Sequence, residues 1–177
     1  MILKLIKFNC VKSTNDEALR IIRSKKVSKG IIFSNYQTKG RGTMGKKWIS
    51  YKGNLFVTIF YSLENIDLTI KELTKLNVNL VMKLISCYYR KNIKLKLPND
   101  ILVNRRKICG ILQEKVQKKG INYLIVGIGL NLIKSPNIKE NPTTSLYELT
   151  KKKLNTKKVS EQLMLIYNNF FKSKGFF

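Results

Sequence analysis

Apolar residues recur along the chain with two different periods, and each period predicts one kind of secondary structure. In three segments they return every three or four positions, which places them on one face of a helix. Thr14 and Glu17 have the spacing of a capping box, in which each side chain binds a backbone N–H at the start of a helix. Thr69 and Glu72 repeat that spacing. The predicted helices are residues 13–26, 69–89 and 159–174.

Between these helices lie short runs rich in β-branched and aromatic residues, which are typical of strands. The later runs are separated by the turn sequences PND, RRK and KKG, so we expect antiparallel neighbours. This order of elements predicts an α+β domain in which helices pack on a mixed, mostly antiparallel sheet. The predicted strands are residues 30–38, 55–63, 93–97, 101–104, 107–117 and 122–133.

The length of 177 residues fits one domain, which we expect to span residues 1–177. Cys10, Cys87 and Cys109 are odd in number and lack C-x-x-C spacing, which argues against a disulfide framework or a zinc site. Such cysteines suit a reducing compartment. No apolar run approaches the roughly 18 residues that a membrane span needs. We therefore expect a cytoplasmic protein with no membrane partner.

Histidine is absent from the chain, which excludes Ser-His-Asp and Cys-His catalysis and histidine-ligated metals. Lysine and arginine number 35 against 10 acidic residues, a formal charge of +25 that favours a polyanionic partner. The lysines are spread over nearly every segment, however, and form no single basic stripe. A basic nucleic-acid-binding module therefore remains an alternative. Any catalysis must use lysine, arginine, carboxylates, backbone N–H groups or a bound metal.

The sequence GRGTMGKKW at residues 40–48 satisfies the dinucleotide fingerprint G-x-G-x-x-G and nearly satisfies the P-loop pattern. Both motifs need a helix directly after the glycine turn, because the phosphate binds at the helix N-terminus. Here a strand-like run follows instead, and Lys47 replaces the Ser or Thr hydroxyl that would bind Mg²⁺. The pattern therefore indicates a loop between two strands rather than either phosphate motif.

Five short segments stand apart from this scaffold. They are STN at 13–15, QTKGRGTMGKKW at 37–48, KLPND at 96–100, RRKICGIL at 105–112 and VGIGLNL at 126–132. Together they closely resemble the catalytic domain of biotin protein ligases, over nearly the whole chain. The resemblance implies a class II synthetase-like catalytic core and a reaction in two steps. Biotin and ATP would form biotinyl-5'-adenylate, and a lysine of a biotin carboxyl carrier protein domain would then attack the acyl group.

The resemblance also implies roles for individual residues. Arg41 and Lys107 would be catalytic, because fixed positive charge is needed where the biotin carboxylate approaches the α-phosphate of ATP. Asp100 would hold Mg²⁺ through a carboxylate oxygen. The residues at biotin-contacting positions are Ser13, Thr14, Asn15, Gln37, Gly40, Arg41, Gly42, Thr43 and Lys107. The residues at ATP-contacting positions are Lys46, Trp48, Asn99, Asp100 and Asn131.

Several of these residues also have a plain structural interpretation. Thr14 suits a helix cap, Gln37 an edge-strand amide and Trp48 a core position. Lys107, taken alone, would be a solvated lysine. Related octanoyltransferases use a Cys and a Lys. We interpret Cys109 as a buried strand residue, because an acyl-adenylate route needs no protein nucleophile.

Three positions depart from the pattern of the resembled family. Thr43 and Lys46 stand where arginine is usual, and Leu97 replaces a tryptophan, which puts retention of the adenylate in question rather than its formation. The chain begins almost at the STN segment and ends at Phe177. We therefore expect neither an N-terminal DNA-binding domain, with its DNA partner, nor the small C-terminal β-barrel of the family. A lipoate or octanoate ligase of the same fold remains the enzymatic alternative, and a homodimer through a sheet edge is left open.

Overall fold

The computed structural model describes residues 3–24 and 27–176, and its strands lie in a seven-stranded sheet. Their order across the sheet is β1-β2-β3-β7-β6-β5-β4, in which β1 and β2 pair in parallel and the other neighbours pair antiparallel. This arrangement confirms the predicted mixed, mostly antiparallel sheet. The strands are β1 (Leu5–Phe8), β2 (Lys29–Ser34), β3 (Leu55–Ser62), β4 (Ile93–Lys96), β5 (Asp100–Val103), β6 (Arg106–Lys118) and β7 (Ile121–Leu130).

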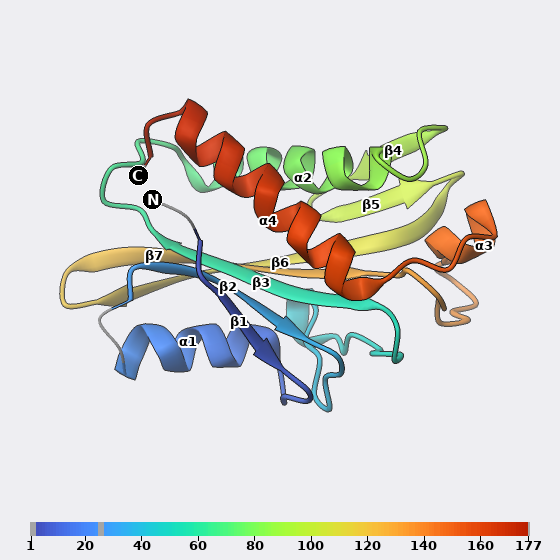
Figure 1. Ribbon diagram of the computed structural model, residues 1–177, viewed down its shortest axis with the longest axis horizontal. Coiled ribbons are helices and arrows are strands. Elements are labelled where there is room, and N and C mark those ends of the chain that lie inside the picture. Colours follow the sequence, from blue (N-terminus) through green and yellow to red (C-terminus); the bar gives the residue numbers. More distant parts are fainter. Residues whose placement is uncertain (1–2, 25–26, 177) are drawn as a thin grey trace.

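Helices cover both faces of this sheet (Figure 1). α1 (Thr14–Ser24) lies on one face, whereas α2 (Ile70–Ser86) and α4 (Thr156–Ser173) lie together on the other. The α+β fold class and the three predicted helices are therefore confirmed. The predicted end of the first helix, residues 25–26, lies outside the described residues.

Each face of the sheet has its own apolar core. The larger core lies between the sheet and the pair α2 and α4. Successive residues of β7 point to opposite faces of the sheet. Val126, Ile128 and Leu130 are buried in the larger core. Gly127 and Gly129 face the α1 side. The smaller core packs α1 on its face of the sheet, and its buried members are Ala18, Ile21, Ile22, Ile32, Phe60, Tyr123 and Ile125.

The two expected capping boxes have different outcomes. The Thr69 hydroxyl accepts a hydrogen bond from the Glu72 backbone N–H at 3.2 Å, and the Glu72 carboxylate accepts one from the Thr69 N–H at 2.8 Å, so this box is confirmed. The predicted capping box of Thr14 and Glu17 is wrong. Thr14 is already the first helical residue, and its N–H and hydroxyl both donate to Gln37 Oε1, at 2.9 and 3.0 Å. The start of α1 is thus attached to the chain that follows β2.

Three short elements were not predicted. Strand β1 has only four residues, and helix α3 (Leu146–Thr150) begins after Ser145, whose hydroxyl accepts a hydrogen bond from the Glu148 N–H at 3.2 Å. A 3₁₀ turn at Thr43–Gly45 lies inside the glycine loop, with Met44 at a φ of 52°. Each element is too short for a periodic pattern to develop. None of the described helices is long and apolar enough to cross a membrane.

Candidate active site

The five segments singled out in the sequence meet on the α1 face of the sheet. They surround a cavity between the start of α1, the loop after β2 and strands β6 and β7. A second cavity adjoins the first and extends toward the segment before α3. The residues that line both cavities are Gly42, Thr43, Trp48, Asp100 and Lys107. These shared residues mark the boundary at which two ligands could meet.

The floor of the site is bare backbone where β6 and β7 pair. Gly110 stands directly opposite Gly129, and the ring of Trp48 lies on both. A Cβ at Gly129 would lie 2.4 Å from Trp48 Cε2, and one at Gly110 would lie 2.7 Å from Trp48 Cζ3. Gly127 is covered in the same way by Asn15, whose Oδ1 would lie 2.3 Å from a Cβ. These three glycines were not predicted, although the alternation of glycine with apolar residues in VGIGL was an available signal for Gly127 and Gly129.

Buried polar side chains line one end of the first cavity. Ser13, Thr14 and Gln37 are only 2%, 4% and 8% exposed, and all three face the cavity. Gln37 Oε1 accepts both hydrogen bonds from Thr14, and Gln37 Nε2 lies 3.4 Å from the Ser50 hydroxyl. The Ser13 hydroxyl and the second N–H of the Gln37 amide remain at this end of the cavity for a polar ring.

Asn15 holds the start of α1 against the sheet. Its Oδ1 accepts a hydrogen bond from the Thr58 hydroxyl at 2.6 Å, and its Nδ2 donates to Glu114 Oε2 at 2.7 Å and to the Leu112 carbonyl at 3.4 Å. These partners use most of the hydrogen-bonding capacity of the amide, so Asn15 shapes the wall of the cavity. Thr58 and Glu114 were not predicted, because they come from β3 and β6, far from the STN segment in the sequence.

The glycine loop folds back on itself between β2 and β3. The Gly42 N–H donates to the Lys46 carbonyl at 2.7 Å, and the Trp48 N–H donates to the Gly40 carbonyl at 2.9 Å. A Cβ at Gly40 would lie 2.6 Å from the Trp48 carbonyl oxygen, so glycine is needed for this close approach. The loop joins two strands, which confirms the prediction made when both phosphate motifs were rejected.

Arg41 extends from this loop toward α1 and β6. Its Nη1 and Nη2 donate to the two carboxylate oxygens of Glu114 at 2.9 and 2.8 Å, and Nη2 lies 2.9 Å from Asp16 Oδ1. The hydrogen bond with Glu114 is the main reason that the pKa of Arg41 is raised above its ordinary value. The Arg41 guanidinium thus pairs with two carboxylates, those of Glu114 and Asp16. The role of Arg41 in ligand binding stays a prediction.

Lys107 lies at the boundary of the two cavities. Its ammonium is 2.7 Å from Asp100 Oδ1 and 5.3 Å from the centre of the Trp48 ring. The backbone of Lys107 is fixed on both sides, because its N–H donates to the Pro142 carbonyl at 2.8 Å and its carbonyl accepts from the Thr144 N–H at 2.9 Å. The side chain can therefore reach a charge in either cavity while its backbone stays in place.

The second cavity combines apolar surface with positive charge. Its apolar lining is Trp48, Ile49, Pro136 and Ile138. Its lysines are Lys46, Lys47 and Lys107. The indole N–H of Trp48 is buried without a hydrogen-bond partner in the described part of the chain, so it leaves a donor for a ligand. A flat ring that carries a polyanion matches this combination.

Two predicted asparagines brace the walls of these cavities. Asn99 Nδ2 donates to the Ile111 carbonyl at 2.6 Å, which ties the turn before β5 to β6. Asn131 is 1% exposed, and its Nδ2 donates to the Thr144 carbonyl at 3.1 Å. Both asparagines border the cavities, and their contact with ATP stays a prediction.

A family model supports the resemblance that the motifs indicated. The model of the biotin/lipoate A/B protein ligase family matches residues 7–131, which is more than half of the chain. The chain belongs to this family. This family member is 32% identical over 125 residues to the bifunctional ligase/repressor BirA of Escherichia coli, across 69% of this chain and 38% of BirA. It is 30% identical over 128 residues to the biotin–[acetyl-CoA-carboxylase] ligase of Paracoccus denitrificans, across 71% of this chain and 53% of that protein.

The family member therefore spans about half the length of these curated relatives, or less. Solved structures share its fold. The biotin protein ligase from Aquifex aeolicus in complex with biotin and ATP has a TM-score of 0.80 at 27% identity, covering 96% of this chain and 70% of that chain. The P. falciparum LipL1 structure in complex with lipoate has a TM-score of 0.61 at 13% identity and shares the fold alone. The Aquifex aeolicus structure and the curated relatives confirm the predicted similarity to a biotin ligase core.

The fold of this family member brings the predicted site residues together. Those predicted to contact biotin that line the first cavity are Ser13, Thr14, Asn15, Gln37, Arg41, Gly42, Thr43 and Lys107. Gly40 lies against Trp48 at the base of the same loop. Those predicted to contact ATP that line the second cavity are Lys46, Trp48, Asp100 and Asn131, while Asn99 lines the first. Their contacts with ligands stay predictions.

Cys109 lies apart from the ligase-family site. It is fully buried in the larger core, on the face of the sheet that α2 and α4 cover. Burial raises the pKa of its thiol well above the ordinary value, which disfavours the reactive thiolate. The prediction that Cys109 is a buried strand residue is confirmed.

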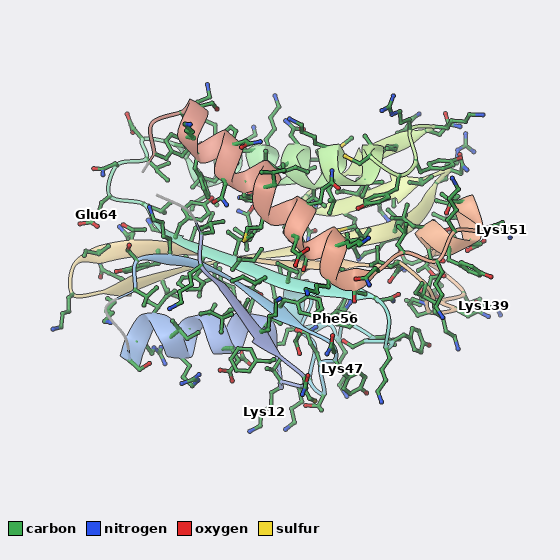
Figure 2. The ribbon with its side chains drawn as sticks, in the orientation of Figure 1. Lys12, Lys47, Phe56, Glu64, Lys139 and Lys151 are labelled. Atoms are coloured by element: carbon green, nitrogen blue, oxygen red, sulfur yellow. The ribbon has the colours of Figure 1, made fainter. Side chains whose placement is uncertain are left out.

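Lysines are dispersed over the surface of this family member. Figure 2 shows Lys12 and Lys47 below the sheet, whereas Lys139 and Lys151 lie at the end of the molecule near α3. These labelled lysines thus lie in separate parts of the molecule, in agreement with the even spread of lysine along the sequence.

Proposed function

We propose that this chain activates biotin with ATP as biotinyl-5'-adenylate and transfers the biotinyl group to a lysine of a biotin carboxyl carrier protein domain. One observation carries the proposal: two cavities of different chemistry meet at Lys107, which lies in one of the motifs that resemble biotin protein ligases. The relative from Aquifex aeolicus was solved with biotin and ATP, a pair of ligands that matches the two cavities.

The polar end of the first cavity favours biotin over a linear acyl chain. Biotin carries a ureido ring, with hydrogen-bond donors and an acceptor, at the end far from its carboxylate. Ser13, Thr14 and Gln37 offer hydroxyl and amide groups in a buried wall. Octanoate and lipoate have no such polar ring. They would therefore make no use of the hydrogen-bonding capacity that this wall has left after the contacts between Thr14 and Gln37.

In the first step, an oxygen of the biotin carboxylate attacks the α-phosphorus of ATP. The new P–O bond forms as the bond from the α-phosphorus to the pyrophosphate oxygen breaks, and pyrophosphate leaves with the electron pair. Two anions must approach each other, so a fixed cation at the boundary of the cavities stabilises the charge that accumulates there. Lys107 lies at that boundary, and Asp100, 2.7 Å away, orients its ammonium.

Asp100 would also hold Mg²⁺. It lines both cavities, and Mg²⁺ commonly binds one or two carboxylates together with substrate phosphates. Among the described residues, no group of three or more His, Cys, Asp or Glu side chains could hold a metal by itself. The donor set therefore fits an ion that arrives with ATP, and such an ion would neutralise phosphate charge.

In the second step, the carrier lysine nitrogen attacks the acyl carbon. The amide bond forms as the bond from that carbon to the phosphate oxygen breaks, AMP leaves, and the nitrogen loses a proton. Lys107 would stabilise the phosphate charge of the departing AMP. We place the reaction in a reducing compartment such as the cytoplasm, which the three free cysteines support.

ATP–pyrophosphate exchange tests the first step, with biotin, octanoate and lipoate offered separately. Of the three acids, we expect only biotin to support exchange. We also expect Lys107→Ala to lose most of the exchange activity with biotin. Lys71→Ala changes an exposed lysine of α2, on the opposite face, and should exchange at the wild-type rate. Exchange with octanoate or lipoate instead would assign another substrate to the site. A lack of exchange together with tight, salt-sensitive RNA binding would favour the nucleic-acid-binding module.

A further inference from the structure

The side chain of Arg41 already has two anionic partners. Its guanidinium makes a bidentate pair with Glu114, at 2.9 and 2.8 Å, and also reaches Asp16 at 2.9 Å. The three side chains are partly exposed, at 40% for Arg41, 31% for Glu114 and 48% for Asp16. One positive and two negative charges leave this group with a net negative charge. It is therefore a poor site for a further anion such as a carboxylate.

Glu114 connects the glycine loop to the wall of the first cavity. The same Oε2 that pairs with Arg41 accepts a hydrogen bond from Asn15 Nδ2 at 2.7 Å. Asn15 is itself held by Thr58 at 2.6 Å. Glu114 thus ties together the loop after β2, the start of α1 and strand β6, which are the three elements that surround the polar end of the cavity.

This group of charges also lies away from Lys107. The Lys107 ammonium would lie 3.4 Å from a Cβ at Gly110, and Glu114 follows Gly110 by four residues on the same face of β6. Four residues of strand span about 13 Å. Arg41 and Lys107 are therefore placed toward opposite ends of the cavity. Only Lys107 lies where the biotin carboxylate and the α-phosphate are proposed to meet.

We propose that Glu114 and Asp16 form a latch for the glycine loop, and that Arg41 is a positioning residue which does not contact biotin. The purpose of the latch rests on the proposed biotin-ligase function: it holds the loop over the polar end of the first cavity while biotin is bound. Biotin then leaves more slowly, and the chemistry at Lys107 is untouched. Arg41 serves to fix the loop backbone beside the ligand.

Biotin affinity separates a latch from a direct ligand. Glu114→Gln weakens the contact between Arg41 and Glu114, whereas Arg41→Ala removes this contact together with the one to Asp16. A latch predicts that each raises the Kd for biotin about fivefold, the scale of a partly exposed ion pair, and that the double variant binds no worse than Arg41→Ala alone. Direct ligation predicts that Glu114→Gln frees Arg41 and leaves the affinity unchanged or tighter. Calorimetry that gave this second pattern would overturn the latch.

The rate of adenylation at saturating biotin separates a loosened loop from a general loss of structure. A general loss of structure would lower this rate as well as the affinity. We expect both variants to keep at least about half of the wild-type rate once biotin saturates the site, because the latch acts on binding and not on the transition state. A large loss of rate that persisted at saturation would place Arg41 at the reacting atoms, against the proposal.

Limited trypsin digestion tests the latch without any ligand. The cleavage sites within the loop are Lys39, Arg41, Lys46 and Lys47. An unlatched loop in Glu114→Gln should be cut several-fold faster than the wild-type loop, because cleavage follows local opening. Glu17→Gln is the matched control, since it makes the same change of charge and breaks the 2.8 Å pair with Arg20 on the exposed side of α1. Equal cleavage of wild type, control and Glu114→Gln would refute the latch.

The latch and the proposed function fail in different ways. If the wild-type protein binds no biotin, the proposed function is wrong, and the digestion alone decides the latch. If the wild-type protein binds biotin and exchanges pyrophosphate while Glu114→Gln changes neither affinity nor digestion, the latch is wrong and the function stands.

Discussion

At the scale of single residues, the proposed chemistry depends most on Lys107, which lines both cavities. Lys107→Ala should slow adenylation about 10- to 100-fold, because a charge-assisted contact is worth about 1.5–3 kcal/mol. Biotin should still bind, since the polar end of the cavity is unchanged. Single-turnover adenylation and calorimetry with biotin measure the two effects separately. An unchanged rate would mean that Lys107 is an ordinary surface lysine.

Thr43 also lines both cavities, but it carries no charge. An arginine there would add a charged contact to the phosphate of the adenylate and slow its dissociation about tenfold or more. The wild-type protein should therefore release biotinyl-adenylate and biotinylate bystander lysines, and Thr43→Arg should reduce this labelling. Mass spectrometry of an unrelated lysine-rich protein, incubated with enzyme, ATP and biotin, measures the release. Equal, low labelling would mean that the loop already retains the intermediate.

The residues of the site were predictable from the sequence to a greater extent than their partners. The motifs identified Thr14 and Asn15, but their partners Thr58 and Glu114 lie 44 and 99 residues away along the chain. A motif is local in the sequence. A partner on another strand depends on the register between strands, which no short segment specifies by itself. The latch between Glu114 and Arg41 was missed for the same reason.

At the scale of elements, β7 supplies the floor on which Trp48 lies, and Trp48 is the one tryptophan of the sequence. Gly129→Ala should displace the ring, because the new methyl group would overlap it, and should shift the tryptophan emission to longer wavelength. Gly127→Ala, on the same face of the strand, would meet Asn15 instead. This second variant should weaken biotin binding and leave the emission unchanged. Identical spectra of wild type and Gly129→Ala would contradict the contact.

Helices and long strands were predictable because an apolar face repeats several times within each of them. Strand β1 gave no such signal, since it has four residues and pairs only with β2, at the edge of the sheet. The three-dimensional structure explains this strand. Helix α1 connects the parallel strands β1 and β2, and the apolar face of α1 is buried against the sheet. Helix α3 is likewise too short to repeat, and only its cap residue Ser145 marks its start.

At the scale of the whole molecule, the lack of histidine leaves no side chain with an ordinary pKa between about pH 5 and 8. We expect the free energy of unfolding to be level across this range and to fall in acid. Burial pushes the pKa of Glu148 upward, but hydrogen bonds from Arg106 and Thr144 hold it below its ordinary value. Such a carboxylate stabilises the fold above its unfolded pKa, about 4.3, and this stabilisation is lost as the pH falls through the folded value.

Urea unfolding at neutral, mildly acidic and strongly acidic pH measures this dependence. Glu148→Gln is the control, because it cannot take up the proton and should lose less stability in acid than the wild-type protein does. A step in stability between about pH 6 and 7 would contradict the expectation, because it would require another side chain with a pKa shifted into that range.

The alternation along β7 has a consequence for how this chain can diverge. Val126, Ile128 and Leu130 are buried in the larger core, so substitutions there would destabilise the fold. At Gly127 and Gly129 any added side chain would overlap Asn15 or Trp48. A lineage that acquires a different acyl substrate therefore has little freedom on this strand. New specificity has to arise in the start of α1 and in the loop after β2, which rest on the floor without being part of it.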